Sequence, residues 1–259
     1  PVVALRETYD ISDNIQLDAR VEHRTNLAAR MVNETASRNT TEALENPYLG
    51  LSERATSMQQ TISSSGSSLT FLAYHADLSD SPETYNFRFQ TDKPLNGVYA
   101  AARFKLGEDT QLEFNQGVVR EERSMLGSES EGAFALGNSH TLHAGLRATH
   151  RITDCPTLFG RYHRGNTHAE STPGSLLSRG GTVSTDSFAF GLGMEEMFEQ
   201  GDRLHLSVSQ PMRIQSGQAS LLLPVATART GENIFQSTNL NLSPTGREQN
   251  LRFSYSLPL

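Results

Sequence analysis

The sequence predicts an all-β fold: an antiparallel up-and-down barrel of about 12 strands, preceded by a short helical or irregular N-terminal segment. Three observations predict it. From Leu69 onward, apolar and polar residues alternate with a period of two, as in a strand that has two unlike faces. Short glycine-containing turns and longer polar stretches separate the alternating runs. The length of 259 residues also fits about twelve strands of ~10 residues with their loops.

Composition excludes several classes of protein. The chain has 22 basic and 29 acidic residues, and its net charge of −7 argues against a sequence-independent nucleic-acid binder. The single cysteine, Cys155, excludes an internal disulfide framework and a multi-cysteine zinc site. No run approaches the ~20 apolar residues of a membrane helix. Because the chain begins with Pro1, we expect it to be a processed or excised piece.

Residues 1–65 differ from the rest and are predicted to be an N-terminal linker. They are polar and mostly lack two-residue alternation, and Asn46-Pro47 is a helix breaker. A short helix is predicted near 51–62, where four apolar residues follow helical spacing: Leu51, Ala55, Met58 and Ile62. The serine-rich run 63–68 is predicted to be a flexible linker, so the barrel is expected to occupy residues 66–259.

The strands are predicted where alternation is clearest: 85–90, 100–106, 111–115, 141–148, 188–194, 203–209 and 251–259. Tight hairpin turns are expected at 107–109 and 200–202, and a longer one at 244–246. Wider polar stretches lie near 120–132, 165–185 and 226–236. Short turns that alternate with long loops are typical of an outer-membrane barrel.

One apolar face and one polar face have two interpretations. In a soluble sandwich the apolar face points into the core, whereas in a membrane barrel it points out to lipid and the polar face lines the lumen. Charged residues would then face the lumen at five positions: Arg103, Glu113, Arg147, Arg161 and Arg252. The aromatic content of 7% and the absence of Trp count against the membrane barrel. The alternation by itself leaves both interpretations open.

Two C-terminal segments resemble a known family. Residues 202–225 (DRLHLSVSQPMRIQSGQASLLLPV) and residues 243–259 (SPTGREQNLRFSYSLPL) resemble the autotransporter-like C-terminal domain of bacterial subtilisin-like serine peptidases. A weaker resemblance extends back through 185–191 and 132–137, so that it covers about residues 66–259. The ending Pro258-Leu259 departs from an aromatic terminus, and proline removes a donor from the strand ladder.

The resemblance implies a transmembrane β-barrel that serves as a non-enzymatic translocator in the bacterial outer membrane. It would anchor or export an upstream subtilisin-like passenger domain. Its expected partners are outer-membrane lipid, the barrel-assembly machinery and that passenger, with no nucleic acid. The last strand would be the assembly signal, with its apolar face formed by Leu251, Phe253, Tyr255, Leu257 and Leu259. An edge strand with an apolar face is physically suited to pairing with another sheet.

No catalytic, cofactor or metal site is predicted. A subtilisin-like site needs a Gly-Thr-Ser-type turn, and Gly181-Thr-Val-Ser184 lies instead in a polar stretch. Four histidines (His140, His143, His163 and His168) and Cys155 are residue types that bind metals, but their spacing matches no ligand pattern. Two alternatives remain: a soluble or surface-bound β-rich interaction or assembly module, and a barrel hydrolase with a site at its rim.

Overall fold

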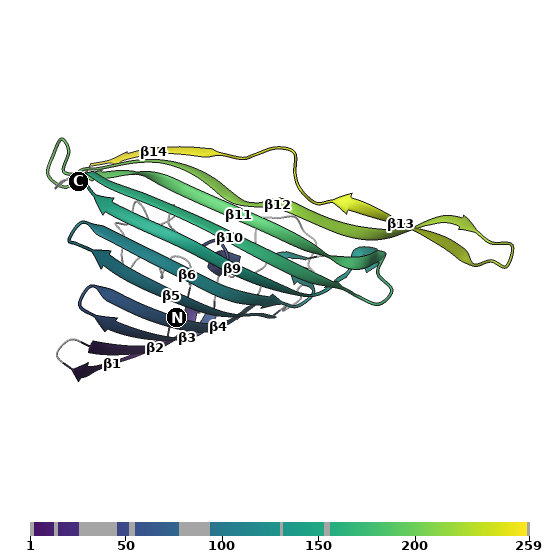
Figure 1. Cartoon of the computed structure of the whole chain (residues 1–259), viewed down its shortest axis with the longest axis horizontal. Helices are drawn as coiled ribbons and strands as arrows, with labels where there is room; N and C mark the ends of the chain where they lie inside the picture. The colour runs from purple at the N-terminus through teal and green to yellow at the C-terminus, as the bar shows by residue number, and fades with distance from the viewer. Residues whose placement is uncertain are drawn as a thin grey trace.

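A computed structural model describes residues 3–12, 15–25, 46–51, 55–77, 94–129, 132–152 and 156–257. Twelve strands form one antiparallel sheet (Figure 1). They are β1 Val3–Ser12, β2 Ile15–Thr25, β3 Ala55–Ser64, β4 Ser67–Asp77, β5 Pro94–Leu106, β6 Thr110–Glu121, β9 Leu136–Arg151, β10 Pro156–Ser171, β11 Leu177–Glu195, β12 Arg203–Thr227, β13 Asn233–Asn241 and β14 Asn250–Ser256. The predicted all-β, antiparallel, up-and-down architecture is therefore confirmed.

The remaining elements are short. Strands β7 (Ser124–Met125) and β8 (Ser128–Glu129) form a small separate hairpin after β6. Two 3₁₀ turns, η1 (Leu49–Leu51) and η2 (Gly132–Phe134), precede β3 and β9. The structure contains no helix long and apolar enough to cross a membrane within its described ranges.

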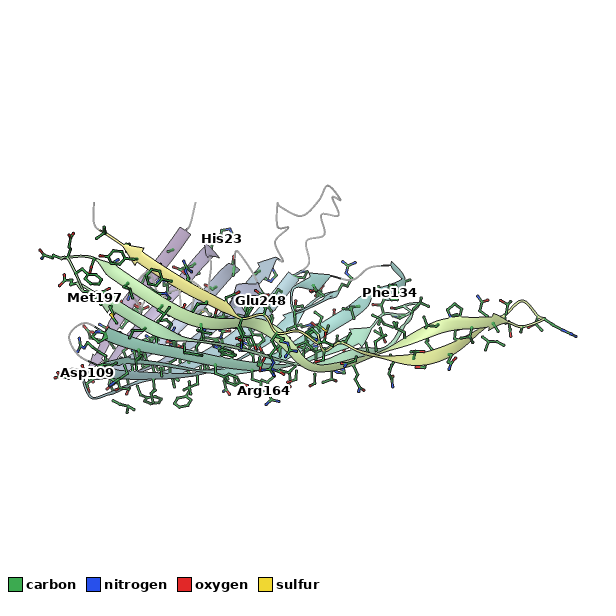
Figure 2. All side chains as sticks on the ribbon, turned by 90° about the horizontal axis from the view of Figure 1, so that it is seen from above. His23, Asp109, Phe134, Arg164, Met197 and Glu248 are labelled. Carbon is green, nitrogen blue, oxygen red and sulfur yellow. The ribbon has the colours of Figure 1, made fainter. Side chains whose placement is uncertain are left out.

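Each strand from β1 to β12 pairs with its neighbour in the large sheet, and β12 is shared by two partners. The first part of β12 pairs with β14, and its last part pairs with β13. The β12–β13 hairpin consequently extends well beyond the other strands (Figure 1). No pairing among the described residues joins β1 to β13 or β14, so the sheet is open. Figure 2 shows the sheet curved, with the purple and yellow edge strands, β1 and β14, on the same side of the strands in its middle.

The two faces of the sheet differ in burial and in chemistry. One face, here the inner face, buries polar side chains (Gln59, Asn115, Thr141, His143 and Ser187, among others). It also buries an apolar cluster of Leu72, Tyr74, Leu95, Tyr99 and Val119, packed with Tyr48 and Leu49. The other, the outer face, carries large apolar side chains that are exposed: Val98, Phe114, Leu142, Phe190 and Phe253, among others. In a soluble globular domain, side chains of this last kind mostly face the core.

Two of the predicted hairpin turns are confirmed. Gly107 (φ 71°) lies between β5 and β6, and Gly201 (φ 85°) lies between β11 and β12. Both backbone angles fall in the left-handed region that glycine adopts without a steric cost. The stretch 244–246 is instead part of the connection from β13 to β14 along the side of β12, where Leu242 donates its N–H to the carbonyl of Gly217. The predicted long loop at 165–185 is also wrong, because β10 and β11 leave only residues 172–176 between them.

The predicted helix near 51–62 is wrong. Residues Ala55–Ser64 form strand β3, which pairs with β2 and β4 along its whole length. Met58 and Ile62 lie on the outer face, whereas Ala55 is buried on the inner face. The apolar residues that would share one face of a helix are thus divided between two faces of a strand. Pairing with two neighbours supplies hydrogen bonds and side-chain contacts that outweigh weak helical spacing.

The region 1–65 also differs from the predicted linker. Strands β1, β2 and β3 belong to the large sheet, and they bring its count to twelve. The serine-rich run is a tight β3–β4 turn around Gly66 (φ 84°) rather than a flexible linker. The predicted strand at 85–90 lies outside the described residues.

Candidate functional site

A row of charged residues crosses the inner face. Arg103, Glu113, Arg147 and Arg161 lie on β5, β6, β9 and β10, and each is the register partner of the next. Arg103 Nη2 is 2.9 Å from Glu113 Oε2, and Arg147 forms a second ion pair with the same oxygen. Glu113 and Arg147 are buried. Buried charges are tolerated when they are paired in this way.

The row ends at β10, and the fifth predicted charge lies apart from it. Arg161 Nη1 donates to Ser187 Oγ on β11 at 3.1 Å. From Arg161 the register continues through Ala189 and Ser209 to Asn250. Arg252 therefore lies two positions further along β14, where it is exposed. The structure brings four of the five predicted charges together.

Residues Asn46–Leu51 pack against the inner face, although no local pattern in the sequence indicates this. Tyr48 and Leu49 are completely buried. The Tyr48 ring stacks on the His143 imidazole, with centroids 4.5 Å apart and planes 12° apart. Its hydroxyl hydrogen-bonds Thr185 Oγ1 at 2.9 Å. Asn46 Nδ2 donates to Asn115 Oδ1 at 3.4 Å, so this segment contacts β6, β9 and β11.

Glycines on the inner face make room for aromatic rings. A Cβ at Gly165 would lie 2.5 Å from the Tyr48 hydroxyl, and one at Gly145 would overlap the His163 ring. The same relation holds across the sheet for five glycine–ring pairs: Gly97 with Tyr74, Gly117 with His143, Gly145 with His163, Gly165 with Tyr48, and Gly191 with Phe159. Each ring can lie against bare backbone only because the glycine has no side chain.

The inner face keeps unused hydrogen-bonding capacity. Three buried histidines carry ring nitrogens with no partner among the described residues: His143, His163 and His205. The histidines do not form one metal site, because His140 and His168 pair across the outer face while His143 and His163 lie on the inner face. Within the described ranges, no group of three or more His, Cys, Asp or Glu side chains is placed to hold a metal ion. Cys155 lies outside those ranges.

The C-terminal strand β14 is an edge strand, and among the described residues it pairs with β12 alone. Leu251, Phe253 and Tyr255 pair with Val208, Leu206 and Leu204 of β12, and all three project from the outer face. Leu257 follows the strand and is exposed, and Leu259 lies outside the described residues. The predicted assembly signal therefore forms an apolar ribbon beside β12.

The buried carboxylate of Asp202 links β14 to the turn between β11 and β12 by hydrogen bonds. Asp202 accepts hydrogen bonds from the backbone N–H groups of Met197, Phe198 and Glu199, and from the Tyr255 hydroxyl at 2.9 Å. Burial alone would raise the pKa of Asp202, but these four donors outweigh it and hold the pKa below the ordinary value of 3.8. The turn between β11 and β12 is thus tied directly to β14.

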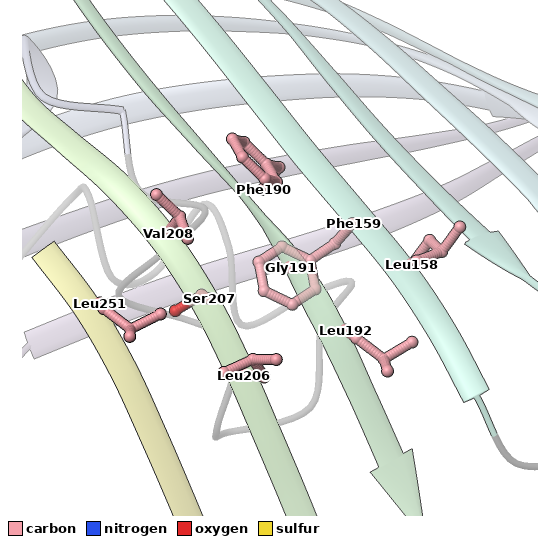
Figure 3. A pocket seen from close by; sticks show the side chains of 9 residues that line it. All are labelled: Leu158, Phe159, Phe190, Gly191, Leu192, Leu206, Ser207, Val208 and Leu251. Atoms are coloured by element: carbon pink, nitrogen blue, oxygen red, sulfur yellow. The ribbon is translucent and has the colours of Figure 1, made fainter. Parts of the chain in front are cut away.

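The outer face is hollowed by an apolar groove between β10, β11, β12 and β14 (Figure 3). Its volume is about 390 Å³, and it lies over the bare backbone of Gly191. The side chains around it are almost all apolar: Leu158, Phe190, Leu192, Leu206, Val208 and Leu251. Its lining thus has the same apolar character as the rest of the outer face.

Comparison of the chain with protein-family models, with curated proteins and with solved structures finds no match in any of the three. A functional proposal therefore rests on the geometry and on the sequence resemblance. The geometry places the stretch Gly181–Ser184 within β11, so this serine lies on a strand rather than on a turn.

Proposed function

We propose that the chain is a non-enzymatic outer-membrane β-barrel translocator that anchors or exports an upstream subtilisin-like passenger. The observation that carries the proposal is the exposed apolar face of the sheet, which lies opposite a buried face that carries charged and polar side chains together with one apolar cluster. Exposed apolar area costs about 25 cal/mol per Å² in water, and lipid removes that cost. The charged, hydrogen-bonding inner face suits a lumen.

The outer apolar surface is continuous across neighbouring strands. One register row runs through five of them, as Ala102, Phe114, Leu146, Tyr162 and Phe188. Isolated apolar residues are common on soluble proteins, but an exposed belt that follows the register across five strands is not. This belt favours lipid as the partner of the outer face.

Strand length supports a membrane span. A spanning strand needs about 9–11 residues. Strands β9 and β10 have 16 residues each, β5 has 13 and β6 has 12. The alternation in the sequence underestimated these lengths, because glycines and small polar residues interrupt the apolar positions.

Closure of the sheet is part of the proposal. Open edges carry unpaired backbone groups, which are costly in hydrocarbon. Strand β1 has 10 residues and β14 has 7, and both present apolar residues on the outer face, including Leu5 and Phe253. In the membrane, we expect β1 and β14 to pair and complete the barrel.

Strand β14 is proposed as the signal that the barrel-assembly machinery binds. Its outer ribbon of Leu251, Phe253 and Tyr255 is exposed, and only one of its two edges is paired within the described residues. A free edge is able to add to another sheet through backbone hydrogen bonds. Replacing Phe253 with Ser is expected to slow assembly, whereas Ser254→Ala, whose side chain points to the other face, is the matched control.

Cell fractionation tests the membrane proposal. The chain is produced with an export signal in a Gram-negative host, and a reporter domain is fused ahead of Pro1. We expect the chain in the outer-membrane fraction, dependence on detergent after extraction, and a reporter that protease removes from intact cells. A monodisperse protein without detergent would overturn the proposal in favour of a soluble interaction module. An inserted chain with a protected reporter would overturn the translocator role alone.

A further inference from the structure

We propose that the protein binds one membrane phospholipid with a zwitterionic phosphate–ammonium head group, at a site where two grooves follow each other along β12. This inference rests on the proposed function, because the site takes its lipid from the membrane around the sheet. It goes beyond that function, since general contact with lipid requires no polar groove beside the apolar belt.

The polar half of the site lies at an interruption in the pairing of β12. This strand pairs with β14 up to Ser209 and with β13 from Gln218 onward, so residues 210–217 have no register partner on that side among the described residues. The connection from β13 to β14, residues 242–249, lies beside this stretch instead. Three hydrogen bonds hold it there: Leu242 N–H to the Gly217 carbonyl, Ser243 Oγ to the Gln215 carbonyl at 2.7 Å, and Arg213 Nη2 to the Pro244 carbonyl at 2.6 Å.

A groove of about 430 Å³ remains between β12 and this connection. Strand β12 contributes residues 210–214 to its lining, and the connection contributes Leu242, Pro244, Gly246 and Glu248. Two buried polar atoms of lining residues have no hydrogen-bond partner among the described residues, Gln210 Oε1 and Arg213 Nε. Gln210 is only 1% exposed, so its free acceptor is costly unless a bound group supplies a donor. The groove therefore offers one donor and one acceptor to a ligand.

The apolar groove of Figure 3 continues along the same two segments of the chain. On β12 its lining ends at Val208, two residues before Gln210, and on β14 it includes Leu251, three residues after Glu248. Its volume of about 390 Å³ lies in the range of small-molecule sites, about 300–1,000 Å³. An apolar groove followed by a polar one suits an amphipathic molecule, because neither part of the ligand is then buried against surface of the wrong polarity.

The polar groove lies at the border of the apolar belt. On β10 the outer-face residues change from Tyr162 to Arg164, and on β11 they change from Phe188 to Asp186. Arg164, Asp186 and Arg213 are successive register partners in one row. In a membrane protein, the edge of the apolar belt lies at the level of the lipid head groups. An acyl chain in the apolar groove would therefore bring its head group to the polar groove.

The charges of the lining residues favour a zwitterionic head group. Arg213 supplies one positive charge, and the exposed Glu248 supplies one negative charge. The neighbouring Asp186 already accepts hydrogen bonds from Gln210 and Gln215. A phosphate oxygen would accept the free N–H of Arg213, and an ammonium group would donate to Gln210 Oε1 and pair with Glu248. Phosphatidylethanolamine has both groups, whereas phosphatidylcholine has no N–H donor and phosphatidylglycerol has no cation.

Two variants change the two ends of the site, and each has a matched control. Arg213→Gln removes the donor to the phosphate, whereas Arg164→Gln removes an exposed arginine of the same register row that lines neither groove. Val208→Trp fills the apolar groove, whereas Val118→Trp places the same ring on the outer face of β6. A fifth variant, Glu248→Gln, removes the partner of the ammonium group.

The test is native mass spectrometry of the full chain, folded in detergent with one of the three phospholipids at a time. We expect the wild type to retain one phosphatidylethanolamine and to bind it about tenfold more tightly than phosphatidylcholine, the factor that one charged hydrogen bond supplies. Arg213→Gln should weaken this binding by a similar factor, and Val208→Trp should abolish it, while both controls bind as the wild type does. Glu248→Gln should remove the preference over phosphatidylglycerol.

The outcomes distinguish this inference from the proposed function. Equal retention of the three lipids, or retention unchanged in Arg213→Gln and Val208→Trp, overturns the lipid site while the translocator proposal stands. A chain that inserts but retains no lipid also overturns it, and makes an extended peptide beside β12 the alternative occupant. If circular dichroism shows that Arg213→Gln does not fold, Val208→Trp and the comparison of lipids decide. A folded chain that enters neither micelles nor lipid overturns the proposed function and this inference together.

Discussion

The inner and outer faces of the same sheet differ in what they contact. Inner-face groups are buried: Glu113 is ion-paired with Arg147, and His143 stacks on Tyr48, whose hydroxyl hydrogen-bonds Thr185. Outer-face groups such as Phe114 and Phe190 are large, apolar and exposed. Sequence alternation shows that two faces are unlike, but it does not show which of them is packed. Burial shows that the packed face is the one that carries the charged row, many other polar side chains and the apolar cluster around Tyr48 and Leu49.

The largest expected effect concerns the inner face. Glu113→Ala would leave Arg103 and Arg147 without the carboxylate that pairs them, and breaking a buried ion pair costs about 3–5 kcal/mol of unfolding free energy. Urea unfolding in lipid vesicles measures this. The exposed pair Asp109–Arg151, at 3.0 Å, is the control, and Asp109→Ala should cost less than about 1 kcal/mol. Equal losses of unfolding free energy in the two variants would mean that the Glu113 ion pairs are as accessible to water as the exposed pair.

The next effect concerns the outer face. Phe114→Arg places a charge in the middle of the apolar belt and should cost about 2–4 kcal/mol in lipid. Glu108→Arg, in the β5–β6 turn, is the control and should change stability by less than about 0.5 kcal/mol. If Phe114→Arg were neutral, or improved solubility without detergent, the outer face would be one that meets water.

A smaller effect tests how tightly the inner face is packed. Gly145→Ala would force its methyl group into the His163 ring, and overpacking of this kind costs about 1–3 kcal/mol. Gly160→Ala is the control, since its Cβ has only ordinary contacts. The difference between the two unfolding free energies is the measurement. If Gly145→Ala did not lower the unfolding free energy, the side chains around His163 on the inner face would be loosely packed.

These faces were only partly predictable from sequence. Alternation placed the runs that became β5, β6, β9, β11 and the start of β12, because each face of these strands repeats every second residue. It also placed Arg103, Glu113 and Arg147 on one face. The tight turn at Gly107 sets the register that pairs Arg103 with Glu113. Arg147 joins them through the β6–β9 register, which no turn signal in the sequence sets, because residues 122–135 lie between these strands.

Other features depend on contacts that are distant in sequence. Met58 and Ile62 have a spacing that fits either a helix or one face of a strand, and only pairing with β2 and β4 decides between them. Tyr48 is buried because its partner Thr185 lies 137 residues away. No local pattern around Asn46-Pro47 encodes such a partner. The pairing of β12 with both β13 and β14 likewise depends on residues distant in sequence, so the alternation did not predict it.

The smallest expected effect concerns the β11–β12 turn, which Asp202 joins to the outer-face residue Tyr255 of β14. Tyr255→Phe removes one of the four donors to Asp202, so the lowered pKa of that carboxyl should rise toward 3.8. A lowered folded-state pKa stabilises the fold above pH 3.8, and this is lost as pH falls through the folded value. Wild type and variant should therefore differ most at neutral pH and converge in acid. Urea midpoints measured against pH would contradict this if the difference grew in acid.

The most direct test of the central claim is a cysteine scan along β6, from residue 110 to residue 121, in a Cys155→Ser background reconstituted in lipid vesicles. Each cysteine carries a spin label, and its collisions with oxygen dissolved in lipid are compared with its collisions with a water-soluble nickel complex. We expect a two-residue alternation in which Leu112, Phe114 and Val118 have the highest contact with oxygen, while Glu113 and Asn115 have the lowest. Alternation with the opposite phase, or high nickel contact at Phe114, would contradict the account.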